Sequence, residues 1–95
     1  MAIAGCQNSG NITTNSVVYK DACRLVSVHV TNGHSTDSCL VVIHDNNSAG
    51  SGKIVLMMNV EAGKSLEYDM HSAKMLNGIH VTLSGGTGNV QVNFA

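Results

Sequence analysis

Apolar and polar side chains alternate along most of this chain with a period of two residues, which is typical of half-buried β-strands. In residues 23–32, for example, Val26, Val28 and Val30 share one side and polar residues occupy the other. Segments of this kind recur at short intervals and are separated by glycine, asparagine and serine. The predicted strands are 17–20, 23–32, 39–45, 53–60, 65–71, 79–84 and 90–95.

Two further segments have a weaker pattern. Residues 11–15 form an eighth strand if they pair with another, and residues 72–78 form either one short helical turn or a loop. Short strands joined by polar turns predict an all-β protein, an antiparallel β-sandwich of seven to eight short strands. The pattern does not distinguish a jelly-roll from an immunoglobulin-like strand order.

The segments 39–45 and 53–60 depart from strict alternation because apolar residues fall on both of their sides. We expect Val41, Ile43, Val55 and Met57 to form a second apolar face. Either neighbouring copies or a larger host surface cover that face, or both faces lie inside the domain, for instance beneath a crossing loop.

Charged residues are scarce and change this picture. They make up only 12% of the 95 residues, against about 25% in an ordinary domain. Since a free small protein usually depends on scattered charges for its solubility, we expect much of this surface to be covered by a partner.

The few charges also bear on which partners are expected. The net charge is −1, and the basic residues are dispersed along the chain. Nucleic acid is therefore not an expected partner, because phosphate binding needs clustered lysine and arginine. No apolar run approaches the roughly 20 residues that span a bilayer, and we expect neither a membrane span nor an export signal.

Five histidines raise the question of a metal site, but their spacing matches no zinc pattern. No particular cysteine and histidine are tied together as a nucleophilic pair. Glu67 and Asp69 share one side of a strand and could form a catalytic carboxylate pair, but we expect them to lie on a solvated face. We predict no catalytic residue, no cofactor and no metal. The histidines are His29, His34, His44, His71 and His80.

Three cysteines, Cys6, Cys23 and Cys39, form an odd and widely spaced set. This set favours free thiols and folding in the cytoplasm over a disulfide framework. A single Cys23–Cys39 disulfide remains an alternative.

Neutral hydrogen-bonding side chains occupy the polar side of several strands. Such a face can pack against protein without the cost of removing water from charges. We predict an interface made by Ser27, His29, Thr31, His80, Thr82, Gln91 and Asn93.

An ordered series of segments resembles small structural proteins of tailed bacteriophages. It consists of CRLVSVHVTNG, VVIHDNNSAGSGKIV, VEAGKSLEYDM and NGIHVTLSGGTGNVQVNFA, within residues 23–95. The resemblance implies a β-sandwich virion subunit, assembled in the host cytoplasm. It would be a capsid decoration (cement) protein, often trimeric, that binds the major capsid protein or other virion subunits. The alternative is a receptor- or carbohydrate-binding module of a fibre or spike.

The chain is expected to form a single domain over residues 16–95, preceded by an N-terminal arm over residues 1–15. The arm is polar and contains glycine. We expect it to lie along a partner, because it has too little apolar surface to dock on its own domain.

Overall fold

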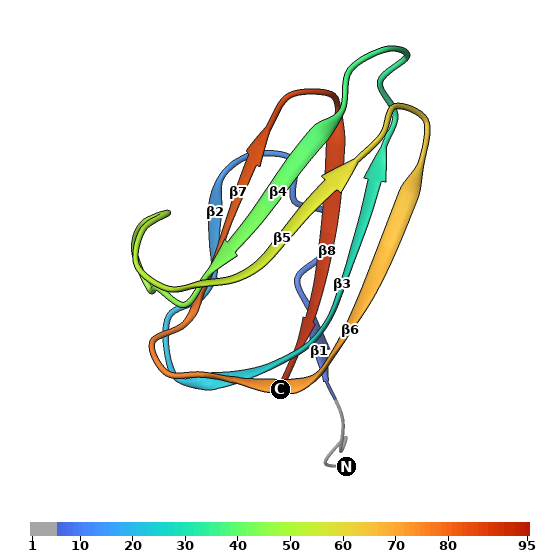
Figure 1. Cartoon of the computed structure of the whole chain (residues 1–95). Coiled ribbons are helices and arrows are strands. Elements are labelled where there is room, and N and C mark those ends of the chain that lie inside the picture. Colours follow the sequence, from blue (N-terminus) through green and yellow to red (C-terminus); the bar gives the residue numbers. More distant parts are fainter. Residues whose placement is uncertain (1–5) are drawn as a thin grey trace.

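The computed structural model describes residues 6–95, and within this range the chain forms strands and no helix (Figure 1). The all-β prediction is therefore confirmed. The strands are β1 (Gln7–Asn8), β2 (Ser16–Tyr19), β3 (Cys23–Asn32), β4 (Cys39–His44), β5 (Ile54–Val60), β6 (Ser65–Met75), β7 (Ile79–Ser84) and β8 (Gly88–Phe94).

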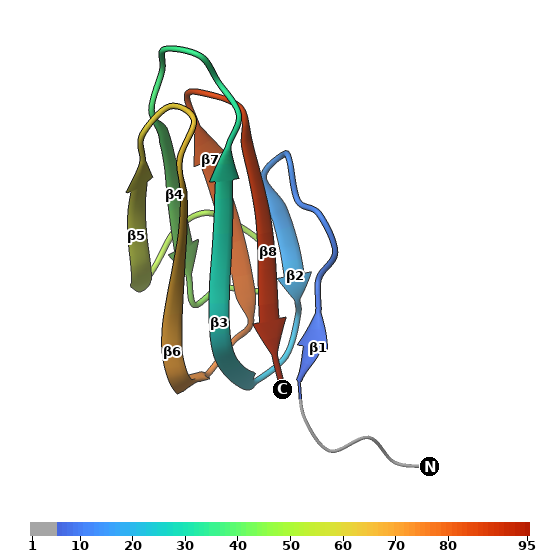
Figure 2. The same ribbon diagram turned by 90° about the vertical axis from the view of Figure 1, so that its right-hand side faces the viewer.

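The strands form two antiparallel four-stranded sheets. One sheet has the order β1-β8-β3-β6 and the other has the order β2-β7-β4-β5. Figure 2 shows the two sheets lying face to face, with β5 and β6 at the same side of the molecule. This packing is compatible with a β-sandwich.

Strand pairing follows a nested pattern along the chain. The first strand pairs with the last (β1 with β8), and β2 with β7, β3 with β6 and β4 with β5 follow inward. Successive pairs alternate between the two sheets, and the β3–β8 and β4–β7 pairings complete them. The chain is thus one long hairpin wrapped around a single core.

The core is almost entirely aliphatic, as the near absence of aromatic residues requires. Each fully buried valine, leucine or methionine side chain contributes roughly 1.5–3 kcal/mol of transfer free energy. Both sheets supply the buried apolar residues: Ile12, Leu25, Val28, Val30, Cys39, Val41, Ile43, Met58, Val60, Met75, Ile79, Val81, Val90, Val92 and Phe94.

A β-bulge in β3 changes which residues face this core. The register of β3 shifts between Leu25 and Ser27 against both neighbours. Val26 is an extra residue relative to β8, whereas three residues of β6, Met70 to Ser72, lie opposite it on the other side. Leu25 is fully buried and Val26 only half-buried. The predicted phase therefore holds for Val28 and Val30 but is wrong at Val26, because a bulge reverses the alternation locally.

The predicted second apolar face is also corrected. Val41 and Ile43 are fully buried in the core, whereas Val55 is half-buried and Met57 is 57% exposed. The odd-numbered residues of β4 face the opposite sheet. Val41 and Ile43 therefore need no partner to cover them.

The segment predicted as a helical turn or loop begins as strand. β6 continues to Met75 and is followed by a turn at Leu76–Asn77. Two consecutive residues within β6, His71 and Ser72, have positive φ angles of 52° and 56°. Non-glycine residues rarely adopt this conformation, and here it bends β6 opposite the β3 bulge.

Asn32 is a buried polar residue that joins three loops at one end of the molecule. Its Nδ2 donates to the carbonyl oxygens of Asp37 (2.8 Å) and Val60 (2.9 Å). Its Oδ1 accepts from the backbone N–H groups of His34 (3.0 Å) and Thr87 (3.1 Å). With all four bonds made, its burial does not leave polar groups unsatisfied.

The described part of the N-terminal arm packs on its own domain. Gln7 and Asn8 pair with β8, and Ile12 forms a bridge with Val90 and is only 8% exposed. The expectation that the arm cannot dock on its own domain is therefore wrong for residues 6–15, because one isoleucine and backbone pairing suffice. Residues 1–5 lie outside the described part of the chain.

This packing predicts that the arm stabilises the domain. Replacing Ile12 with alanine should lower the free energy of unfolding by about 2 kcal/mol, because it removes buried methyl groups beside Val90. Denaturant unfolding measures the change, and Thr13→Ala, at an exposed neighbouring position, is the control. Equal stability of the two variants would contradict the observed packing.

Candidate interaction surfaces

Five of the seven predicted interface residues lie together on the outer face of the β1-β8-β3-β6 sheet. Ser27 is the cross-strand partner of Asn93, and His29 is the partner of Gln91. Thr31 follows in the same row and is exposed, and the other four are half-buried. Ser27, His29, Thr31, Gln91 and Asn93 are called the polar face below.

Hydrogen bonds between side chains order much of the polar face. Asn93 Nδ2 donates to Ser27 Oγ (2.9 Å), and Asn8 Nδ2 donates to Asn93 Oδ1 (2.8 Å). Gln91 Nε2 donates to Asn11 Oδ1 (2.8 Å). The arm therefore holds the amides of Gln91 and Asn93 in place.

Two carboxylates border the polar face on β6. Asp69 is the cross-strand partner of Ser27, and Glu67 is the partner of His29. Both acids are exposed, and Asp69 Oδ1 accepts a hydrogen bond from the His71 backbone N–H (2.8 Å). Their exposure agrees with the solvated face that the sequence predicts for these two acids.

The remaining two predicted interface residues, His80 and Thr82, lie on β7 in the other sheet. His80 is only 8% exposed, so its assignment to a water-facing surface is wrong. The loop between β4 and β5 covers it. A Cβ atom on Gly50 would lie 2.7 Å from Thr82 Oγ1 and 3.3 Å from His80 Cε1, so the loop approaches β7 this closely only because residue 50 is glycine.

His80 lies beside a second buried histidine. His44 of β4 is its cross-strand partner and is also 8% exposed. Within the described residues, His44 Nδ1 has no hydrogen-bond partner. Burial and then the proximity of His44 lower the pKa of His80 below its usual value of 6.5. Sequence reasoning missed this pair, although two histidines on the outward-facing positions of apolar strands were a signal for it.

Next to His44, Asp45 organises the turn between β6 and β7. Its carboxylate accepts backbone N–H groups from Leu76 (2.9 Å) and Asn77 (2.8 Å), and a longer one from Gly78 (3.3 Å). Burial by itself raises the pKa of Asp45, but these donors together with the charge of Lys53 outweigh it and lower the pKa. Asp45 is therefore an ionised carboxylate at 6% exposure.

We predict that Asp45→Asn lowers the free energy of unfolding by about 2 kcal/mol, because a neutral amide accepts these hydrogen bonds more weakly than a charged carboxylate. Denaturant unfolding at neutral pH measures this loss. Asp37→Asn, at an exposed aspartate, is the matched control. Unchanged stability of Asp45→Asn would show that the turn is not held by the carboxylate.

The burial of His80 predicts a stability that depends on pH. Because the pKa of His80 is lower when folded, the unfolded chain takes up a proton first as the pH falls through 6.5. Its contribution is thus complete above that pH and is lost as the pH falls towards the folded pKa. His80→Gln should flatten the slope of unfolding free energy against pH in this window, and identical slopes would count against the prediction.

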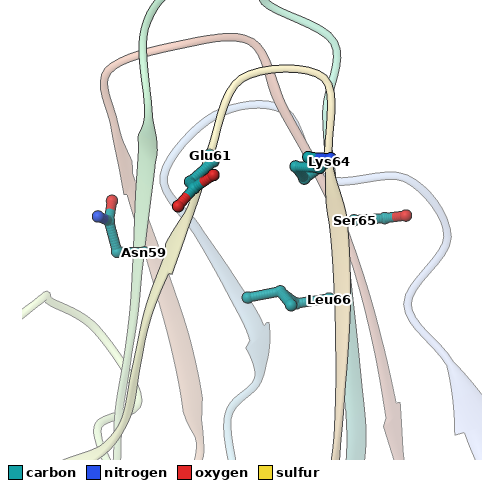
Figure 3. Close-up of a pocket in the computed structure, with 5 residues that line it drawn as sticks. All are labelled: Asn59, Glu61, Lys64, Ser65 and Leu66. Carbon is teal, nitrogen blue, oxygen red and sulfur yellow. The ribbon is translucent and has the colours of Figure 1, made fainter.

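A small hollow lies at the open side of the two sheets, between the edge strands β5 and β6 (Figure 3). Its volume is about 240 Å³, and it is lined by Asn59, Glu61, Lys64, Ser65 and Leu66. Figure 3 shows the Leu66 side chain extending from β6 towards β5, with Ser65 directed the other way. The hollow is smaller than the roughly 300 Å³ at which typical ligand pockets begin.

The cysteines and acids provide little reactive chemistry. All three cysteines are free, so the alternative Cys23–Cys39 disulfide is absent. Burial raises the pKa of Cys39, and burial followed by the charges of Asp45 and Asp21 raises that of Cys23, which disfavours the reactive thiolate. Within residues 6–95, no three histidine, cysteine or acidic side chains gather closely enough to hold a metal ion.

Comparisons with protein-family models, curated proteins and solved structures found no match to this chain. In the described part of the chain, no helix has the length and hydropathy required to cross a membrane.

Proposed function

We propose that this protein is a non-enzymatic structural subunit of a bacteriophage virion, a capsid decoration (cement) protein that binds the major capsid protein. The observation that carries the proposal is the polar face, a row of hydrogen-bonding side chains across β3 and β8. Within it, Asn93 is bonded to Ser27, and both Asn93 and Gln91 are bonded to the arm. The resemblance to phage structural proteins supplies the identity of the partner.

The chemistry of the polar face suits a protein partner. Four of its five residues have side chains that do not ionise at neutral pH, so covering them does not carry the desolvation cost of a buried charge. Each amide still has hydrogen-bonding capacity for a second partner. Order within the face before binding reduces the entropy lost on association.

Glu67 and Asp69 at the border of the polar face favour a capsid surface that carries positive charge opposite β6. Many copies on one capsid would add modest contacts through a high effective concentration. We also propose that the protein self-associates, and the phage resemblance favours a trimer. We propose no contact with nucleic acid or with a membrane.

We further propose that the domain is a jelly roll rather than an immunoglobulin-like sandwich. Jelly rolls contain eight strands in two Greek keys. Support comes from the nested pairing of β1 with β8, β2 with β7, β3 with β6 and β4 with β5, in which successive pairs alternate between the sheets. An immunoglobulin-like domain does not wrap one long hairpin in this way.

The alternative function is a carbohydrate- or receptor-binding module of a phage fibre or spike. Exposed aromatic rings usually stack on sugars, and two tyrosines are available here. Tyr68 is 44% exposed on β6, whereas Tyr19 on β2 packs against Phe94 with ring centroids 5.2 Å apart. Because β2 and β6 lie at opposite edges of their sheets, the two rings do not form one platform.

Co-sedimentation with purified empty heads of the phage that encodes the protein tests the proposal. The wild-type protein should sediment with the heads. Gln91→Lys should weaken binding by about tenfold or more, because it places an unpaired charge in the contact. The control is Ser84→Lys, which adds the same charge at an exposed position on the other sheet and should bind as the wild type does.

Two results would contradict the proposal. In the first, the wild-type protein fails to sediment with heads; binding of the same protein to a glycan array would then support the fibre module. In the second, Gln91→Lys and Ser84→Lys bind heads equally well. That result would show that the polar face does not contact the heads.

A further inference from the structure

The four sheet edges differ in how they are protected from pairing with another chain. At one side of the molecule, β1 and β2 are short strands of two and four residues. At the other side, β6 is long but carries Glu67 and Asp69 and bends at His71 and Ser72. Short length, charge and irregular backbone are the usual means by which proteins block an edge.

β5 has little of this protection. It is seven residues long, pairs with β4 on one side only and contains no charged residue. Two of its large apolar side chains are exposed, Ile54 by 50% and Met57 by 57%. A free edge of this kind presents unpaired backbone N–H and C=O groups to any strand that can lie beside it. Figure 2 shows β5 at the outer margin of its sheet.

The sequence of β5 is compatible with antiparallel pairing to itself. From Ile54 to Val60 the strand contains no charged residue, and its central residues are Leu56, Met57 and Met58. Two copies placed antiparallel about Met57 therefore bring large apolar side chains opposite one another and place no like charges in contact.

We propose that β5 pairs antiparallel with β5 of a second copy across a two-fold axis at Met57, joining two four-stranded sheets into one of eight strands. Each Met57 then lies against Met57 of the partner subunit, and Leu56 lies opposite Met58 of the partner subunit. Such a contact is isologous, so it closes on itself and ends at two copies.

An irregularity in β5 bounds the regular part of this pairing. Ile43 pairs with Leu56 and His44 with Ile54, so Val55 is an extra residue in β5. The bulge falls near the end of the paired segment and leaves Leu56–Met58 regular.

This inference goes beyond the capsid proposal and does not depend on it. The polar face and β5 belong to different sheets, so a dimer can form whether or not heads are bound. The edge joins two copies, so the dimer is an alternative to the trimer that the phage resemblance favours, and the mass of the protein in solution distinguishes the two.

Light scattering coupled to size exclusion measures the number of copies. The wild-type protein should have the mass of a dimer, and Met57→Lys should raise the dissociation constant by about 100-fold by placing like charges at the two-fold axis. Leu76→Lys, at an apolar residue 62% exposed outside β5, is the control and should remain dimeric. A monomeric wild-type protein, or a trimer unaffected by Met57→Lys, would overturn the pairing.

A cysteine at the proposed axis provides a direct readout. In a Cys6→Ser background, Met57→Cys should form a disulfide between copies on mild oxidation, because directly opposed Cβ atoms lie about 4.5–5.5 Å apart. Leu76→Cys in the same background should remain unlinked. Equal cross-linking of both variants would indicate random collision and would contradict the axis.

Discussion

Burial of aliphatic side chains between two facing sheets is the interaction on which the rest of this structure depends. The chain has one phenylalanine and no tryptophan, so valine, isoleucine, leucine and methionine supply nearly all the buried area. Both sheets contribute, and the nested pairing brings strands from the two ends of the chain into the same sheet. Residues 6–15 are held to the domain for the same reason, since Ile12 completes the core beside Val90.

Two buried polar side chains bind loops that lie outside the apolar core. Asn32 bonds to three loops at one end of the molecule, and Asp45 accepts three backbone N–H groups of the β6–β7 turn near the other. Each is buried only because its hydrogen-bonding capacity is used. Close approach of the β4–β5 loop to β7, which needs glycine at position 50, buries the His44–His80 pair.

The two proposals use different parts of this surface because the parts differ chemically. The polar face presents ordered side chains that mostly cannot ionise, which suits contact with another protein surface. The edge of β5 presents backbone groups and exposed apolar side chains, which suits another strand. Since the two lie on separate sheets, one copy can contact a capsid and a second copy at once. The scarcity of charged residues is physically consistent with both surfaces being covered.

Local alternation along the chain determined the all-β class and most of the strand positions, because period two is typical of half-buried strands. It also placed Ser27, His29 and Thr31 on one side of β3, and Gln91 and Asn93 on one side of β8; only the pairing of these two strands brings the five residues together. Which sheet a strand joins was not determined by it, since pairing depends on contacts between residues far apart in sequence. Tertiary structure therefore separated His80 and Thr82 from the other five, placed Val41 and Ile43 in the core and moved the phase of β3 at Val26. It also buried Asn32, Asp45, His44 and His80, because the burial of a polar residue depends on which loop lies over it, and local sequence does not encode that neighbour.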